Sequence, residues 1–282
     1  MQIGLIGAGL MGHGIAANLL KHGHGLRVIA HSNRKPIDDL VGRGATEVKD
    51  LKEMARAEVI FLCVSTSKVV EETIAKLRPH LRKSQIIIDA GTTEPAVTRR
   101  LAQELAAIGV GYADAPMTGG PEQAEAAELG VLCGADAKTY AALEPLFKCY
   151  AATIRHFGEA GSGHTAKLIS NFLVTGMVAL VAQAFDAATR ASIDWRGLYE
   201  VMLNGSGNSG VLRKMVGSAL EGDFGKYRFS IENAHKDIGY YKLLAEELGC
   251  SGPLNEALEE FFADAVKSRR GRQHVSQLLE KK

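Results

Sequence analysis

The stretch GLIGAGLMGHG, residues 4–14, is the most informative about the fold of the first half of the chain. Its three spaced glycines follow an apolar run of strand type, Ile3–Ile6, and open a helical run. In that context Gly7 can make a tight turn, Gly9 can let backbone amides approach a pyrophosphate, and Gly12 can let helix and strand pack closely. A flexible loop would explain the glycines but not their place between strand and helix. The stretch therefore predicts a dinucleotide-binding turn at a helix N-terminus.

Short apolar runs alternate with amphipathic helical stretches up to about residue 160. The runs that we expect to be strands are Ile3–Ile6, Leu26–Ala30, Val59–Val64, Ile86–Asp89, Gly111–Ala115, Leu129–Cys133 and Ala151–Phe157. Apolar strands separated by helices indicate βαβ units and a parallel sheet that is buried on both faces. Residues 1–161 are therefore expected to form a Rossmann domain of the α/β class, with a doubly wound parallel sheet.

The strand pattern stops after the glycine-rich stretch Gly158–Gly163. The helices expected beyond it are His164–Ala191, Trp195–Leu203, Leu212–Glu221, Ile231–Leu248 and Pro253–Ser268. Residues 162–282 are thus expected to form an all-α domain for substrate binding and dimerisation, beginning with a long interdomain helix. That helix has too much apolar surface for a lone exposed helix, which predicts a homodimer or homotetramer. Its most apolar part, Phe172–Phe185, has about 14 residues, fewer than the ~20 that span a bilayer.

Composition excludes several classes of function. The 282 residues include 33 basic and 32 acidic side chains, so no net field favours nucleic acid or a membrane surface as a partner. The nine histidines show no metal-ligand spacing, and we expect no metal and no catalytic role for His164 or His235. The four cysteines form no CxxC pair, and there is no cleavable leader pattern, which favours a cytoplasmic location. They are Cys63, Cys133, Cys149 and Cys250.

The choice of dinucleotide is decided at the end of the second strand, where NAD-binding proteins place an acid for the ribose hydroxyl. No Asp or Glu occurs between Gly12 and Asp38, and the strand is followed by Asn33 and Arg34. A guanidinium can grip a 2′-phosphate and stack on adenine, so the sequence favours NADP over NAD. The alternative is that Arg34 and Lys35 are only solvated loop charges, which would leave the choice open.

Four segments together resemble the β-hydroxyacid dehydrogenase family, the group of 3-hydroxyisobutyrate dehydrogenases, tartronate semialdehyde reductases and related semialdehyde reductases. They are Gly4–Gly12, Asp114–Gly120 (DAPMTGG), Gly161–Asn171 (GSGHTAKLISN) and His235–Asp237. The resemblance covers essentially the whole chain. It implies an NADP(H)-dependent enzyme that interconverts a small 3-hydroxy acid and its semialdehyde or keto acid.

The resemblance also implies the site residues. Reduction of a carbonyl needs a proton donor near the oxygen, and Lys167 is the expected general acid and base. Asn171 lies one turn later on the same helix face, and Asp237 is expected to support Lys236. The expected substrate contacts are Thr118, Gly119, Gly120 and Lys236. The expected cofactor contacts are Gly7, Gly9, Leu10, Met11, Gly12, Asn33, Arg34, Val64, Thr92 and Lys236.

Two positions depart from the family pattern. Thr118 stands where the family usually has Ser, and Ala127 stands where the family tends to place Gly. Threonine keeps the hydroxyl that can anchor a carboxylate-bearing substrate, but its methyl group and the acidic run after it change the surroundings. Two other functions stay open at this point, an imine reductase and a non-catalytic NADP-binding module. Imine reductases generally have a residue other than lysine at the position of Lys167, which disfavours the first.

Overall fold

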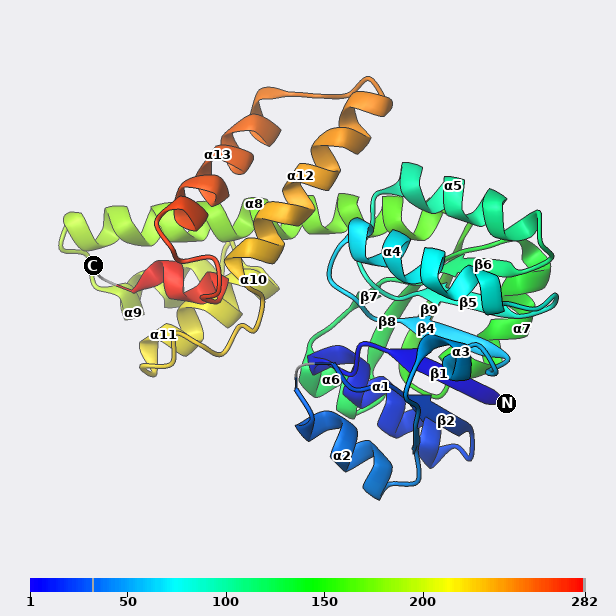
Figure 1. Ribbon diagram of the computed structural model, residues 1–282. Coiled ribbons are helices and arrows are strands. Elements are labelled where there is room, and N and C mark those ends of the chain that lie inside the picture. Colours follow the sequence, from blue (N-terminus) through cyan, green and yellow to red (C-terminus); the bar gives the residue numbers. More distant parts are fainter. Residues whose placement is uncertain (32, 281–282) are drawn as a thin grey trace. The chain divides into compact units, whose positions relative to one another are not determined.

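The structure is a computed structural model that describes residues 1–31 and 33–280 (Figure 1). Ser32, next to the expected cofactor-selecting residues, and the last two lysines lie outside the described residues. The chain divides into two compact units, Met1–Lys167 and Leu168–Lys282. Helix α8 (Ser162–Arg190) belongs to both, because the division falls within its second turn.

A single sheet forms the centre of the first unit. Its strands are β1 (Gln2–Ile6), β2 (Gly25–Val28), β3 (Thr46–Glu47), β4 (Val59–Leu62), β5 (Ile86–Asp89), β6 (Gly111–Asp114), β7 (Met117–Thr118), β8 (Leu129–Gly134) and β9 (Ala151–Gly158). They are ordered β3-β2-β1-β4-β5-β6-β8-β7, with β9 beside β8. The first six follow the 3-2-1-4-5-6 order of a doubly wound dinucleotide-binding sheet. The expected Rossmann fold is confirmed.

The sheet is mostly parallel, as expected, and it also contains an antiparallel strand. Strand β8 runs antiparallel to both β6 and β7, whereas the pairs from β3 to β6 and the pair of β8 with β9 are parallel. A parallel return requires a long crossover, but the chain between β6 and β8 holds only β7 and the five-residue helix α6 (Pro121–Glu125). The direction of the chain therefore reverses there.

Both faces of the centre of the sheet are covered, and the central strand β4 is apolar and buried at every position. In β4, Val59 and Phe61 pack into one hydrophobic cluster, and Ile60 and Leu62 pack into another. The first cluster is completed by α1 (Leu10–Lys21), α2 (Lys35–Gly42) and α7 (Ala137–Phe147). The second is completed by α3 (Leu51–Met54), α4 (Ser67–Leu77) and α5 (Pro95–Ala106), with the short helix η1 (Arg78–His80) after α4.

The second unit is helical and has a core of its own, in which Val178, Phe185, Ile238 and Phe262 are buried. After α8 its helices are α9 (Trp195–Leu203), α10 (Gly210–Leu212), η2 (Arg213–Gly217), α11 (Ser218–Leu220), α12 (Ile231–Glu247), α13 (Pro253–Lys267) and η3 (Val275–Leu279). The expected helix over Leu212–Glu221 is therefore interrupted, since η2 is a π-helical segment between two short α-helical turns. The expected all-helical domain is confirmed.

Among the described residues, one helix, α8, is long and apolar enough to cross a membrane by length and composition alone. Its most apolar 18 residues have a mean hydropathy of 1.8, and 39% of them are buried within the chain. The helix is longer than Phe172–Phe185, the apolar run that was expected to be too short to span a bilayer. A core helix of a soluble protein meets the same measures, so the finding is a weak indication, and the absence of a membrane partner stays a prediction.

Candidate functional site

The turn between β1 and α1 has the geometry of a pyrophosphate cradle. Gly7 has a φ of +103°, and a Cβ there would lie 2.2 Å from the carbonyl oxygen of Cys63. A Cβ on Gly12 would lie 2.1 Å from the carbonyl oxygen of Gly7. Gly9 is the N-cap of α1, without a side-chain cap, and a Cβ there would meet no described atom within 4 Å. Backbone amides at an open helix N-terminus suit a phosphate group, so these residues fit a dinucleotide.

Other expected cofactor residues lie at the same edge of the sheet, since β1, β4 and β5 are parallel neighbours. Val64 follows β4, and its carbonyl oxygen is 2.8 Å from where a Cβ on Gly91 would lie. Half-buried Thr92 follows β5. At the start of α1, Leu10 is exposed and Met11 packs partly against the core.

Arg34, the expected 2′-phosphate ligand, is held by two carboxylates. Its guanidinium donates to both oxygens of Glu47 at 3.0 Å and to Asp38 at 2.9 Å. These bonds, first that with Glu47, raise the pKa of Arg34 above its usual value. The neighbouring Asn33 accepts the backbone N–H of Lys35 at 3.2 Å. No local pattern indicates Glu47 as a partner of Arg34, because the two are 13 residues apart in the chain.

Glu47 also borders a surface cavity of about 470 Å³. The cavity is lined by Ile29, Ala30, Glu47, Val48 and Lys49. These residues follow β2 or surround the end of β3. Since β2 is a parallel neighbour of β1, and β3 is a parallel neighbour of β2, the cavity lies beside the strand ends at which a doubly wound sheet binds its ligand.

The backbone of the expected substrate turn adopts a conformation that favours glycine. Thr118 ends β7 and is exposed, and its hydroxyl is 2.4 Å from where a Cβ on Gly130 would lie. Gly119 has a φ of +111°, a conformation that favours glycine. The amide of Gly120, an expected substrate contact, is already engaged, because it donates to the side chain of Gln123 at 2.9 Å. A carboxylate could use this amide only by displacing Gln123.

Polar residues of the second unit converge on one buried carboxylate. Asp237 on α12 accepts a hydrogen bond from the side-chain amide of Asn171 on α8 at 2.6 Å. Its other oxygen lies 3.1 Å from Nζ of Lys236, whose ammonium also lies over the ring of Tyr240 at 5.2 Å. Asn171 and Asp237 are both buried. Lys167 is half-buried and precedes Asn171 by one turn of α8.

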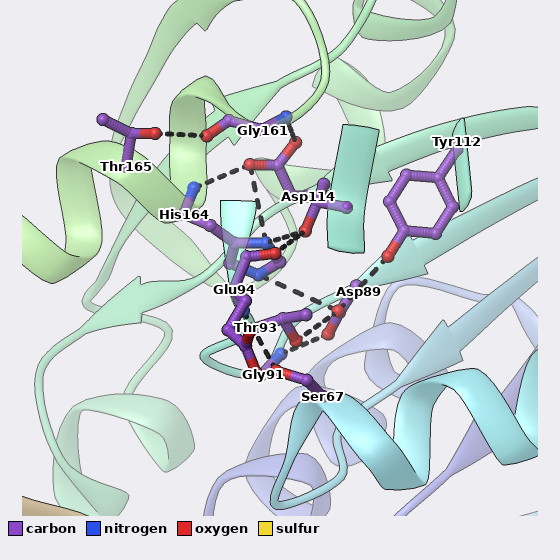
Figure 2. Close-up of polar contacts among 11 residues, drawn as sticks. Ser67, Asp89, Gly91, Thr93, Glu94, Tyr112, Asp114, Gly161, His164 and Thr165 are labelled. Carbon is purple, nitrogen blue, oxygen red and sulfur yellow. Dashed lines mark hydrogen bonds and ion pairs between the residues drawn. The ribbon is translucent and has the colours of Figure 1, made fainter. Parts of the chain in front are cut away.

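A second buried polar cluster was not predicted as a functional feature. It joins the strand-end residues Asp89 and Asp114 to His164, in the first turn of α8 (Figure 2). The sequence assigned no role to His164, since no pattern of spacing connects it with either aspartate. The only available signal was the short distance along the chain from His164 to Lys167.

The glycine turn and the strand order define a protein with an NAD(P)-binding Rossmann domain, which is followed by a helical unit. Residues 2–158 match the NAD binding domain of 6-phosphogluconate dehydrogenase. Residues 161–281 match a family described as NAD-binding of NADP-dependent 3-hydroxyisobutyrate dehydrogenase. The chain belongs to the β-hydroxyacid dehydrogenase family, which includes 3-hydroxyisobutyrate dehydrogenase and acts on CH–OH groups. The resemblance inferred from the four sequence segments is thereby confirmed.

Relatives with assigned reactions match over nearly the whole chain. The chain is 27% identical to 2-(hydroxymethyl)glutarate dehydrogenase of Eubacterium barkeri, covering 99% of this chain and 94% of the relative. It is also 27% identical to 2-hydroxy-3-oxopropionate reductase of Escherichia coli, covering 93% and 90%. The solved structure of Mycobacterium tuberculosis 3-hydroxyisobutyrate dehydrogenase with L-serine has the same fold, with a TM-score of 0.88 at 24% identity and coverage of 99% and 98%.

Proposed function

We propose that the protein is an NADP(H)-dependent enzyme that interconverts a small 3-hydroxy acid and its semialdehyde or keto acid. The observation that carries this proposal is the polar group on α8 and α12, in a chain whose family acts on CH–OH groups. In that group Asp237 contacts both Asn171 and Lys236. Lys167 stands one turn earlier on α8. A binding module that performs no chemistry has no need of such a set.

Lys167 supplies the proton chemistry in this proposal. As an ammonium it donates a proton to the substrate oxygen during reduction, and as a neutral amine it takes the hydroxyl proton during oxidation. Asn171 donates its amide N–H to Asp237, so its carbonyl oxygen is left to accept from the substrate hydroxyl or from Lys167. When bound, the nicotinamide supplies or accepts the hydride.

The cofactor would be held by the glycine turn and the adjoining strand ends. Backbone amides at the start of α1 bind the pyrophosphate, where Gly9 leaves space. Val64 and Thr92 would contact the nicotinamide half. The preference for NADP rests on Arg34, the cation beside the ribose position, and requires that its bonds to Glu47 be exchanged for bonds to the 2′-phosphate.

The substrate is proposed to carry a carboxylate. Thr118 offers a hydroxyl donor at the end of β7, and Lys236 offers a positive charge. Each of these groups suits a carboxylate, the hydroxyl as a hydrogen-bond donor and the ammonium as a charged donor. The amide of Gly120 joins them only where Gln123 gives way.

The test is consumption of NADPH, with NADH in parallel, against succinic, tartronate and methylmalonate semialdehydes and glyoxylate. The proposal expects turnover of at least one of them, with NADPH preferred. A cyclic imine without a carboxylate completes the panel. Turnover of the imine alone would contradict the proposal and indicate an imine reductase. Tight NADPH binding with no turnover on any of the five compounds would favour a binding module.

A further inference from the structure

Two aspartates end neighbouring strands of the sheet and are fully buried. Asp89 of β5 and Asp114 of β6 stand opposite each other in the parallel register. Asp89 accepts the hydroxyls of Thr93 at 2.7 Å and Tyr112 at 3.2 Å, and it accepts the amide of Gly91 at 2.9 Å (Figure 2). Buried carboxylates are stable only when hydrogen bonds and a nearby positive charge compensate for the lost water.

Asp114 holds the beginning of α8. One of its oxygens accepts the backbone N–H of Gly161 at 2.7 Å, and the other accepts the backbone N–H of His164 at 2.6 Å. The first N–H groups of a helix have no partner within the helix, so Asp114 acts as a cap supplied from β6. The same strand leads into the proposed substrate turn at Thr118. Asp114 therefore joins that segment to the helix of Lys167.

The imidazole of His164 lies between the two carboxylates and is fully buried. Its Nε2 is 3.9 Å from Asp89, and its Nδ1 is 3.8 Å from Asp114 (Figure 2). Nδ1 also lies 2.8 Å from the hydroxyl of Thr98, which is 3.2 Å from the carbonyl oxygen of Glu94. Since a carbonyl can only accept, the Thr98 hydroxyl donates to Glu94 and accepts from Nδ1–H.

The second ring nitrogen determines the charge of His164. Nε2 is buried and has no hydrogen-bond partner among the described residues, and the nearest carboxylate it faces is Asp89. A bare nitrogen would repel that carboxylate, whereas a protonated one is attracted to it. The geometry thus favours an imidazolium, with one N–H toward Thr98 and the other toward Asp89.

We propose that His164, as an imidazolium between Asp89 and Asp114, is a positioning residue that fixes the first turn of α8 and thereby aims Lys167. The proposal rests on the proposed function of Lys167, which follows His164 by three residues in the same helix. His164 compensates the charge of Asp114, so that Asp114 stays ionised and keeps both of its backbone bonds to the helix.

The thiol and phenol groups around His164 add no charge to the cluster. Burial raises the pKa of Cys63 and that of Cys133 to about 12, and it raises the pKa of Tyr112 well above its ordinary value. All three are therefore neutral at working pH. Arg99 of α5 packs beside Gly161. Burial also raises the pKa of Asp114, and the positive charge of His164 counteracts that rise.

The test is the pH profile of kcat for His164→Gln, which keeps a polar side chain but removes the charge. Without the imidazolium the pKa of Asp114 rises further. The acid limb of the profile is therefore expected to move to higher pH by at least ~0.5 unit. At neutral pH we expect kcat to fall at least about tenfold, while KM and the NADPH Kd change less than about threefold. His24→Gln, which alters a histidine near the N-terminal amine, is the matched control and leaves the profile unchanged.

An unshifted acid limb with a uniform loss of kcat would overturn the proposal and leave His164 as packing only. If His164→Gln does not fold, Thr98→Val removes the acceptor of Nδ1 and is expected to shift the limb in the same direction. A readout without turnover separates this proposal from the proposed function. Long-range proton–nitrogen NMR at neutral pH is expected to show both ring nitrogens of His164 protonated, and one bare nitrogen would contradict the proposal even in an inactive protein.

Discussion

At the scale of single residues, carboxylates set the direction of the cationic and amide side chains. Asp237 fixes Asn171 and Lys236, and Glu47 fixes Arg34. In the first case the amide nitrogen of Asn171 is engaged, so its carbonyl oxygen is left as the acceptor for the proposed chemistry. In the second case the fixed guanidinium is already paired, so a 2′-phosphate has to compete with Glu47.

This competition predicts how cofactor preference responds to mutation. Arg34→Ala removes the phosphate ligand and is expected to weaken NADPH binding at least about tenfold, with little effect on NADH. Glu47→Gln removes the competing charge and is expected to strengthen NADPH binding severalfold. Fluorescence titration of each variant with both cofactors measures these effects. Arg43→Ala, directly after α2 and paired with Asp39 of that helix, is the control. Equal changes for NADPH and NADH would contradict the role of Arg34.

At the scale of elements, helix α6 ends in a conformation that its sequence does not favour. Ala127 has a φ of +59°, in the left-handed region, and the N–H of Glu128 bonds back to the carbonyl oxygen of Gln123 at 2.8 Å. This bonding pattern ends many helices and usually has glycine at the left-handed position. Although Ala127 departs from the family pattern, its backbone therefore keeps the left-handed conformation that a glycine would have at this position.

Replacing this alanine is predicted to stabilise the protein. Ala127→Gly relieves the left-handed strain, and the gain exceeds the added flexibility of the unfolded chain by ~0.5 kcal/mol. The matched variant Ala126→Gly changes a residue in helical conformation and is expected to destabilise by ~0.5–1 kcal/mol. Urea unfolding of both variants measures the difference, and a loss of stability in Ala127→Gly would show that the strain is absent.

Most elements, but not their pairing, were predictable from the sequence. The alternation of apolar runs predicted seven strands from Ile3 to Phe157, because each is long enough to show a pattern. It could not predict β3 and β7, which have two residues each. It also could not predict that β8 is antiparallel to β6, because strand direction depends on how the chain between them folds. The left-handed end of α6 at Ala127 was indicated only by the glycine that the family tends to have at that position.

The candidate site was predictable where its residues share a motif and unpredictable where they do not. Gly7, Gly9 and Gly12 stand in one short segment whose turn follows from local sterics. The contact of Asn171 with Asp237 spans 66 positions, and that of Asp114 with the amide of His164 spans 50. Such contacts depend on tertiary packing, and no local spacing reports them. The site residues inferred from the sequence stay predictions until variants are measured.

At the scale of the whole molecule, α8 presents an uncovered apolar face. Ile169, Leu173 and Leu180 lie at positions i, i+4 and i+11 of the helix, on one face, and are 52%, 65% and 66% exposed. Exposed apolar side chains gathered on one face of a helix mark association surfaces. We therefore propose that copies of the chain associate through this face.

The expected assembly is a homodimer or homotetramer of the 30.2 kDa chain. Light scattering after size-exclusion chromatography is expected to give two or four times the mass of one chain. Leu173→Glu combined with Leu180→Glu is expected to give the mass of a monomer, because two charges would be buried in the contact. Val41→Glu, at an exposed position of α2, is the control. A wild-type monomer would contradict the prediction.

Lys167 is proposed to perform acid–base chemistry on a substrate that binds with NADPH. The most direct measurement compares kcat and NADPH binding for Lys167→Met with the wild type, with Lys148→Met, a change at an exposed ion pair on the surface, as the control. We predict that Lys167→Met binds NADPH within about threefold of the wild type and loses at least about 100-fold in kcat, while Lys148→Met stays active. A Lys167→Met variant that keeps most of the wild-type turnover would contradict the account.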